Sequence, residues 1–374
     1  MQFGKPLEGT SVRRRWFLGL LYLSLVVFLW VLSSFLIKDL FESGVYKKPY
    51  FITYINTACF SLYLIPHLTS KALVDNLIRE IRHRRNKLTQ RKRRSLVDDN
   101  LTEDEYQHSN IDNEEGQELK ISYHETFILS LQFMLLWVLA NLATNASLSY
   151  TSVASQTILS STSSVFTLVI GYLFSIERVN YFKIMGLILS LFGIVVINEF
   201  DSSSEFHYSN ILVICGNILA LSGAFIYGVY TTLLKLKTVD KNTGMERNLD
   251  TGVFFGLVGL LNLLLFWPFM IFFHFTGIER FELPPTRNIA VKLVINAMIT
   301  FFSDFCWCKA ILLTSPLTAT VGLSMSIPLA LVCSWFVKGF YFNFWYFFGA
   351  VLITTSFFMI SKEEKQDFVN DRLG

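Results

Sequence analysis

The sequence predicts an all-α polytopic membrane protein, with ten transmembrane helices arranged as two inverted five-helix repeats. Of its 374 residues, 52% are hydrophobic and only 16% are charged, whereas soluble domains carry about 25% charged residues. The run from Trp16 to Ile37 holds no charge and is long enough to cross a bilayer as a helix, which takes ~20 residues. The Ser- and Thr-rich stretch Asn145–Ser164 has a counterpart in the second half, which indicates an internal repeat.

The predicted spans follow one another closely along the chain. Linkers such as Ser149–Tyr150 and Thr314–Ser315 are so short that consecutive helices must run antiparallel. After the first span, the apolar segments predict helices at 50–68, 126–148, 151–174, 184–199, 209–234, 252–275, 289–313, 316–337 and 343–361. The chain then divides into an N-terminal segment (1–15), a first repeat (16–199), a second repeat (209–361) and a C-terminal tail (362–374).

The distribution of Lys and Arg predicts the orientation. Loops rich in these residues face the cytosol in most membrane proteins. With the N-terminus inside, the inner side holds Arg13–Arg15, the loop 69–124, Lys235 and Arg247, while the outer loops hold fewer basic residues. Both termini are therefore expected in the cytosol.

The one long hydrophilic segment is the loop 69–124, which we expect to be cytosolic and partly disordered. Its first part, 71–94, is strongly basic, and its second part, 95–118, carries acids with no Lys or Arg. One interpretation is a solvated tether between spans. The other is that the basic part binds anionic lipid of the cytosolic leaflet and the acidic part competes for it.

The internal repeat relates the halves at an offset of 164 residues, because Lys309 falls on Asn145 and Ser324 on Ser160. Each half has an odd number of spans, so the two copies have opposite orientations. Inverted repeats are typical of secondary transporters, whose substrate site lies between the repeats near the middle of the membrane. Close helix contacts are expected at Gly186, Gly193 and Gly349, and the oligomeric state, a homodimer included, stays open.

Two ionisable residues, Asp304 and Lys309, lie within the predicted span 289–313. A charge at membrane depth is costly and marks a functional site by default. The two residues are five positions apart, so they do not share a helical face. Asp304 either lines a cavity or pairs with a neighbouring helix. Lys309 either lines the cavity or extends its ammonium group to the inner membrane surface.

Uncharged polar residues supply the other candidates for a binding site. Gln156 and Ser160 recur at helical spacing in span 151–174, and Thr320 lies on the matching stripe of span 316–337. Such side chains either line a wet cavity or hold helices together through hydrogen bonds. Asn145, at the end of its span, and Tyr227 complete the set. A kink is expected at Pro328, which interrupts an otherwise regular apolar span.

Several strings carry a family resemblance: WVLSSFLI (30–37), KPYFITYINTACF (48–60), TNASLSYTSVASQTILSSTSS (144–164), YGVYTTLLK (227–235) and SDFCWCKAILLTSPLT (303–318). Together with the inverted repeat, they resemble the drug/metabolite transporter superfamily with EamA-like halves, and within it fungal members of the F branch of solute carrier family 35. The resemblance covers residues 16–361. It implies ten spans and a vacuolar membrane, with another endomembrane or the mitochondrial membrane as alternatives, and it leaves the substrate open.

These features predict a secondary transporter that moves a small polar organic metabolite by alternating access. Asn145, Gln156 and Ser160 would hydrogen-bond the substrate. Lys309 would neutralise the anionic group of a nucleotide-type solute, whereas Asp304 would take a coupling proton or a cation such as a thiamine-like vitamin.

The alternative is a non-transporting membrane scaffold that works through the loop 69–124. The sequence has no metal-ligand cluster, nucleophile elbow or Walker loop, so we expect no enzyme activity and no cofactor. The expected partners are a small-molecule substrate and the lipid bilayer, without nucleic acid.

Overall fold

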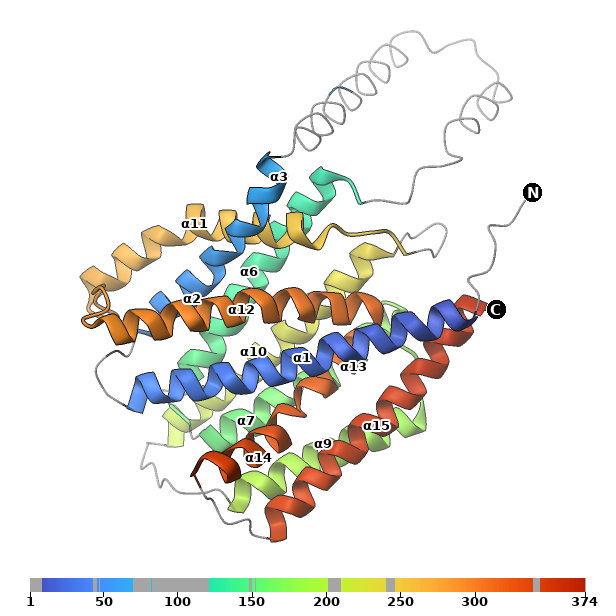
Figure 1. The fold of residues 1–374 in the computed structure, drawn as a ribbon. Helices are drawn as coiled ribbons and strands as arrows, with labels where there is room; N and C mark the ends of the chain where they lie inside the picture. The colour runs from blue at the N-terminus through green and yellow to red at the C-terminus, as the bar shows by residue number, and fades with distance from the viewer. Residues whose placement is uncertain are drawn as a thin grey trace.

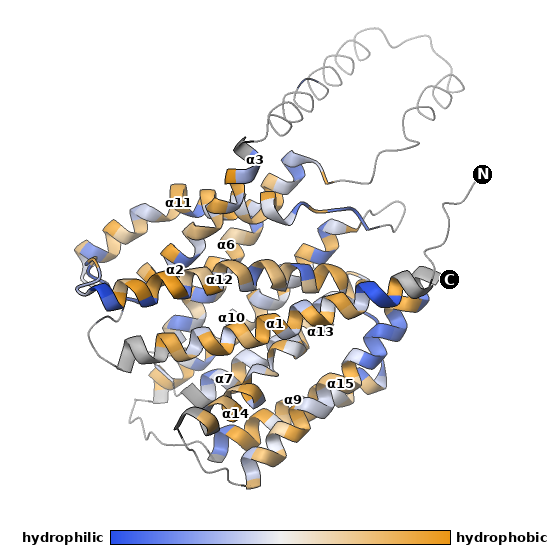
Figure 2. Ribbon diagram, viewed as in Figure 1, coloured by the Kyte–Doolittle hydropathy of each residue, from blue (hydrophilic) through white to orange (hydrophobic). Residues whose placement is uncertain are grey.

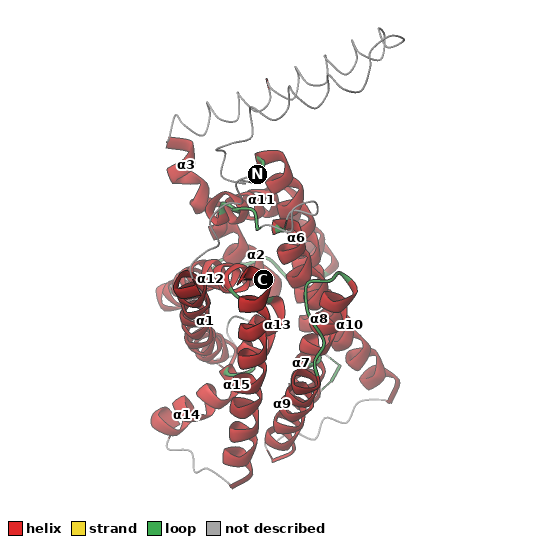
Figure 3. Cartoon of the chain, turned by 90° about the vertical axis from the view of Figure 1, so that its right-hand side faces the viewer, coloured by secondary structure: helices red, strands yellow, loops and turns green. Residues whose placement is uncertain are grey.

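The helices of this protein form one bundle (Figure 1). The computed structural model describes residues 9–42, 48–69, 121–147, 150–151, 153–200, 210–239, 246–338 and 344–373, and the single positions 46 and 82. Within these ranges the chain is helical apart from short loops, and a bridge between extended residues joins Val239 and Glu246 (Figure 3). Apart from position 82, both parts of the hydrophilic loop, 71–94 and 95–118, lie outside the described residues.

Except for the first and the last, the helices begin and end close to the predicted apolar segments. Their bounds are α1 Gly9–Glu42, α2 Pro49–Ala58, η1 Cys59–Leu64 (a 3₁₀ helix), α3 Ile65–Thr69, α6 Tyr123–Ser147, α7 Val153–Ser161, α8 Ser163–Leu173, α9 Tyr181–Phe200, α10 Asn210–Thr238, α11 Thr251–Thr276, α12 Arg287–Leu313, α13 Pro316–Leu323, α14 Ser326–Lys338 and α15 Phe344–Leu373. Polar side chains cap several of them. Asp250 accepts hydrogen bonds from the backbone of Gly252 and Val253 at 3.0 and 3.1 Å and so fixes the start of α11.

Eight segments among the described residues are long and apolar enough to cross a membrane, which confirms a polytopic helical membrane protein. They are Val12–Ile37, Tyr123–Ser147, Tyr181–Glu199, Ile211–Thr238, Thr251–Thr276, Arg287–Leu313, Pro316–Ser334 and Phe344–Asn370. The two remaining predicted spans, 50–68 and 151–174, are present as interrupted helices, α2–η1–α3 and α7–α8. The count of ten spans therefore stays a prediction.

Two helix interruptions precede a proline, the one at η1 and the one between α13 and α14. The 3₁₀ segment η1 ends at Leu64, two residues before Pro66, and the break between α13 and α14 falls at Ser324–Met325, one turn before Pro328. A proline lacks the amide hydrogen and clashes with the carbonyl four residues earlier, so it disrupts the turn that precedes it. The kink predicted from Pro328 therefore takes the form of a break on its N-terminal side.

The outer helices differ from the prediction in length. α1 begins at Gly9, before the predicted span, and α15 continues to Leu373 through the predicted tail. The start of α1 and the end of α15 lie together, with ring centroids of Trp16 and Phe368 5.2 Å apart (Figure 1). We call this side of the bundle the termini end. At the opposite end the α1–α2 and α11–α12 connections meet, where Tyr46 Oη donates to the Glu282 carbonyl at 2.9 Å.

Hydrophobic residues make up most of the helix bodies, and hydrophilic residues gather at helix ends (Figure 2). Large apolar residues such as Phe17, Leu264 and Phe275 are exposed, as expected for a surface that faces lipid. Inside, Phe133 is the centre of an aromatic cluster: its ring centroid lies 5.1 Å from Tyr230, 5.1 Å from Phe254 and 6.0 Å from Trp307.

α9 and α15 pack side by side (Figure 3) at the three predicted glycines. A Cβ atom on Gly193 would lie 2.9 Å from the Gly349 carbonyl oxygen, and one on Gly186 would collide with Ile360. Only glycine permits so close an approach of two backbones. Because these contacts join helices of one chain, the glycines give no support to a homodimer.

Candidate functional site

A cavity of about 600 Å³ lies within the bundle, between helices of both halves of the chain. This volume falls in the range of small-molecule sites, roughly 300–1,000 Å³. Its lining residues are Trp30, Ser33, Ser34, Ile37, Ile52, Thr53, Asn56, Phe133, Trp137, Ala140, Asn141, Thr144, Asn145, Gln156, Thr157, Ser160, Ser161, Ser163, Gly223, Ala224, Tyr227, Tyr230, Phe255, Thr300, Ser303, Asp304, Trp307, Thr320, Leu323, Ser324, Ser326 and Ile327.

The cavity extends from the middle of the bundle toward the end opposite to the termini. On α1 the lining residues lie near its end, at 30–37, and on α6 they reach Asn145, also near the helix end. On α10 and α12 they stop at Tyr230 and Trp307, before these helices reach the termini end. The aromatic cluster around Phe133 forms the inner limit of the cavity.

Aromatic side chains make up the inner wall. The Tyr227 and Tyr230 ring centroids lie 5.0 Å apart, and Tyr230 lies 5.9 Å from Trp307. Trp307 Nε1 donates a hydrogen bond to Tyr227 Oη at 3.1 Å, which fixes both rings relative to each other. Trp30 and Trp137 add two more indoles from α1 and α6.

Hydroxyl and amide groups of α7 and α8 make up another wall. Gln156 Nε2 donates to Ser160 Oγ at 3.0 Å, one helical turn later, so the polar stripe is hydrogen-bonded within itself. The helix breaks at Thr162 directly beside this stripe, and the Thr162 amide donates to the Leu159 carbonyl at 3.1 Å in a tight turn. A further polar group lies at the wall of α1, α2 and α12, where Ser33 donates to Asn296 at 2.7 Å and Asn296 to Asn56 at 3.3 Å.

Of the described residues that line the cavity, Asp304 is the only Asp, Glu, Lys, Arg or His. It is 8% exposed, and its carboxylate lies within hydrogen-bonding reach of the Ser303 hydroxyl and the Trp30 indole. The Ser303 hydroxyl donates its proton to the Thr300 carbonyl at 3.1 Å, so the Trp30 indole is the neutral donor that holds the carboxylate at the cavity wall without neutralising its charge.

The structure brings together six of the seven residues predicted from the sequence: Asn145, Gln156, Ser160, Tyr227, Asp304 and Thr320 line the cavity. Lys309 is not among the lining residues. Its ammonium nitrogen lies 5.7 Å from the centroid of the Phe305 ring, on the side of α12 turned away from Asp304. Five residues on a helix correspond to about 140° of rotation, which explains the separation. Thr320 also donates to the Pro316 and Leu317 carbonyls at 2.7 and 3.0 Å, so its hydroxyl proton is already used.

Several lining residues were missed at the sequence level, notably Ser33, Trp137, Asn141 and Trp307. Helical spacing contained the signal. Trp30, Ser33, Ser34 and Ile37 recur at intervals of three and four residues, and so do Trp137, Asn141 and Thr144. Aromatic residues at helical spacing usually pack in a core, so this spacing alone does not distinguish a cavity wall from a packed interface.

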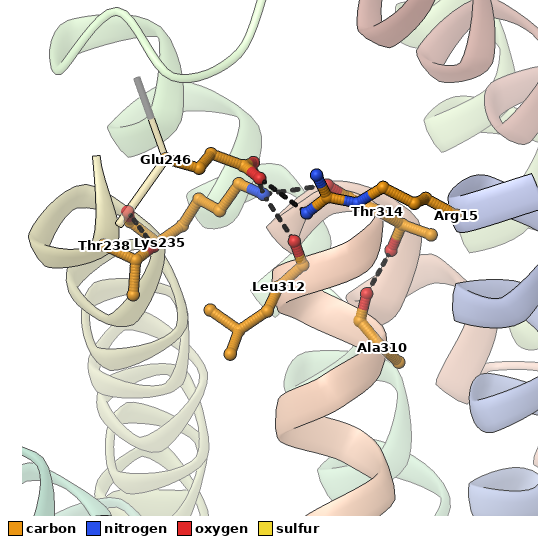
Figure 4. A network of polar contacts seen from close by, with 7 residues as sticks. All are labelled: Arg15, Lys235, Thr238, Glu246, Ala310, Leu312 and Thr314. Carbon is orange, nitrogen blue, oxygen red and sulfur yellow. Dashed lines mark hydrogen bonds and ion pairs between the residues drawn. The ribbon is translucent and has the colours of Figure 1, made fainter. Parts of the chain in front are cut away.

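The termini end is held together by a network around Lys235, the penultimate basic residue of α10 (Figure 4). Its ammonium group donates to Glu246 Oε1 at 2.8 Å and to the carbonyls of Leu312 and Thr314 at 3.0 and 3.2 Å. Those carbonyls belong to the C-terminal end of α12, where backbone acceptors lack helical partners. Arg15 of α1 donates to Glu246 Oε2 at 3.1 Å. One lysine thus ties α10 to α12, and through Glu246 to α1.

A second polar cluster at the same end joins the α8–α9 loop to α13 and α15. Ser175 adopts a left-handed conformation, with φ 57°, and turns the chain so that Glu177 Oε1 accepts from the Leu317 amide at 3.0 Å. Lys183 is paired with Glu364, and with Asp367 at 2.7 Å. Burial and the neighbouring Glu364 carboxylate raise the pKa of Glu177 well above its ordinary value of 4.5.

Comparison with known proteins agrees with this architecture. The model of the EamA-like transporter family matches residues 116–199. An uncharacterized vacuolar membrane protein of Saccharomyces cerevisiae is 45% identical over 96% of this chain and 94% of its own length. The thiamine-repressible mitochondrial transport protein of the same yeast is 40% identical, over 92% of this chain and 91% of its own.

Animal relatives are similar over nearly as much of the chain. Solute carrier family 35 member F5 of Mus musculus is 31% identical, over 95% of this chain and 78% of its own. A protein of known crystal structure aligns with a TM-score of 0.58, over 93% of this chain and 98% of its own, at 11% identity. At that identity the likeness shows the fold alone.

Proposed function

This chain belongs to the EamA-like transporters related to solute carrier family 35 member F5, and we propose that it is a secondary transporter of a small polar organic metabolite that works by alternating access. One observation carries the proposal. The bundle contains a cavity of about 600 Å³ that reaches toward one end, and packed aromatic rings with a polar network lie between it and the other end. Asn145, Gln156 and Ser160 offer hydrogen-bonding groups to a substrate in this cavity.

The proposal includes ten spans in two inverted repeats, and contacts between the halves support it. Gly186 lies against Ile360, and Gly349 lies against Ile197. At an offset of 163 residues, Gly186 matches Gly349 and Ile197 matches Ile360, so each contact is the symmetry copy of the other. α1 packs along α12, and α6 packs along α10. In the proposed repeats α1 corresponds to α10 and α6 to α12, so these two contacts are also copies of each other.

The orientation in the proposal follows from charge. Described residues at the termini end include Arg13, Arg14, Lys235 and Arg247, and such an excess of basic residues favours the cytosolic side. The cavity then extends toward the non-cytosolic side. The likeness to a vacuolar membrane protein supports a vacuolar location, and the name of the mitochondrial relative supplies the alternative.

Uptake into proteoliposomes tests the proposal. The purified full chain would be reconstituted and offered a pool of labelled small metabolites, with empty vesicles as the background. We expect saturable uptake that the variant Ser160→Phe abolishes, because the ring fills the polar wall of the cavity. The matched control is Ser24→Phe, at an exposed position on α1. Folded protein without uptake of any metabolite, or with equal uptake by both variants, would overturn the proposal.

The same assay separates the transporter from the scaffold alternative. A chain without residues 72–118, most of the hydrophilic loop, should keep its uptake if the cavity carries the function. If the chain without this loop keeps full uptake but no longer performs its function in the cell, that function belongs to the loop instead.

A further inference from the structure

One described residue gives the cavity a charge. Among the lining residues that the structure describes, Asp304 is the single acidic side chain, and none is Lys, Arg or His. None of the ion pairs formed among the described residues includes Asp304. A carboxylate that is 8% exposed and lacks a cationic partner is costly to keep at membrane depth. A ligand that brings a positive charge would remove that cost.

The surroundings of Asp304 suit a cation of organic type. The indole of Trp30 lies within hydrogen-bonding reach of its carboxylate, and Trp307, Tyr227 and Tyr230 line the cavity nearby. The faces of aromatic rings attract ammonium and other organic cations, most strongly where water is excluded. A carboxylate together with indole and phenol rings is the composition by which proteins hold such groups.

An anionic substrate meets the opposite conditions. The basic residue nearest in sequence, Lys309, lies outside the cavity beside Phe305, so it cannot neutralise a phosphate or carboxylate bound there. The other polar groups of the described lining residues are neutral hydroxyls, amides and indoles. A nucleotide-type anion would therefore lie beside Asp304 with no compensating charge, which is strongly unfavourable in a region of low dielectric constant.

We infer that the cavity binds an organic monocation, held by the Asp304 carboxylate and the rings of Trp30, Tyr227, Tyr230 and Trp307. The inference rests on the proposed function and names the substrate class of its site. One carboxylate matches one positive charge. The hydroxyl and amide groups of Gln156 and Ser160 are available to polar substituents of the same molecule.

Thermal stabilisation of the purified full chain tests the substrate class. A ligand that binds only the folded state raises the melting temperature according to its concentration relative to its dissociation constant. The probes are three pairs: choline and its neutral carbon isostere, thiamine and thiamine diphosphate, and 1-methylnicotinamide (the pyridinium cation) and nicotinate. At least one cation should raise the melting temperature, and the neutral or anionic member of its pair should not.

Two variants assign the effect to the cavity. Asp304→Asn keeps the size of the side chain and removes its charge, so the cation should bind at least about thirtyfold more weakly, as when one member of a buried charge pair is removed. Asp304→Glu should restore binding in part. Lys309→Gln removes a charge five residues away on the same helix but outside the cavity, and should bind the cation like the wild type.

Failure of the inference can be told apart from failure of the proposed function. If anions alone stabilise the protein and enter proteoliposomes, the chain is a transporter and the assignment to cations is overturned. If cations stabilise Asp304→Asn as well as the wild type, Asp304 is not their site. Stabilisation by none of the cations, in protein with a sharp melting transition, also overturns the assignment, whether or not uptake of another metabolite is measured.

Discussion

The substitution Lys235→Met should open the termini end of the bundle. The Lys235 side chain is 9% exposed and makes three bonds, to Glu246 and to the carbonyls of Leu312 and Thr314. Methionine has similar length without the donors. Both carbonyls lose their partner, whereas Glu246 keeps Arg15 at 3.1 Å, so no carboxylate is left unpaired. A hydrogen bond to a charged group contributes ~1.5–3 kcal/mol, and water replaces part of what is lost. The state in which the termini end is closed should therefore lose about 2–4 kcal/mol of stability relative to the open state.

This loss should appear as a change in the accessibility of one native cysteine. Cys308 of α12 is fully buried, close to the termini end, since it lies one turn before Leu312. In a background where the other four cysteines are alanine, a membrane-impermeant maleimide would be added from the side of the termini. Each 1.4 kcal/mol is a factor of ten, so Lys235→Met should speed labelling by roughly 30- to 700-fold. Labelling from the opposite side should not accelerate.

Matched controls separate the bonds from the charge. Lys237→Met removes a positive charge from the same helix end, where the side chain is exposed, and should label like the wild type. Arg15→Ala breaks a partly exposed ion pair worth about 0–1 kcal/mol and should speed labelling by at most about fivefold. If Cys308 in Lys235→Met reacts at the wild-type rate, the network does not keep this end closed and the reasoning is wrong.

Two further predictions concern stability at the boundary of the two halves. Gly193→Val places a branched side chain against the Gly349 backbone and should cost about 1–3 kcal/mol, seen as a lower melting temperature; an unchanged value would mean that α9 and α15 separate at no cost. The raised pKa of Glu177 means that its stabilising contribution is complete below 4.5 and is lost as pH rises through the raised value. The side chain in Glu177→Gln cannot titrate, so the melting temperature of this variant should fall less than that of the wild type as pH rises above 4.5. If the two melting temperatures fall in parallel with pH, Glu177 is not the group that titrates.

The sequence predicted the membrane class and the position of each helix, because both depend on apolar runs that need no tertiary context. The interruptions were only partly predictable. Pro66 and Pro328 predict a break on their N-terminal side, whereas the break at Thr162 has no proline or glycine at or beside it. That break depends on how α7 and α8 pack against other helices, which is not encoded in local propensity.

The candidate site could be predicted to a similar degree. Polar and ionisable residues within apolar runs identified six lining residues, because such residues are rare at membrane depth and face a cavity or a neighbour. The choice between those alternatives depends on the rotation of each helix. Lys309 shows the difficulty, since it lies on the same helix as Asp304 yet points away from the cavity. The rings of Trp137 and Trp307 were missed because packing and pocket lining give the same sequence pattern.

The breaks in α7–α8 and α13–α14 share a backbone solution although only one has a proline. At the first, Thr162 and Val165 donate to carbonyls three residues earlier, at 3.1 and 2.9 Å. At the second, Ser324 and Met325 do the same, at 3.1 and 3.0 Å. A turn tightened in this way keeps its amides bonded, so it can lie in the membrane without the cost of unsatisfied groups. Both turns adjoin the cavity, at matching positions of the proposed repeats, and are therefore where each half can bend while its backbone stays hydrogen-bonded.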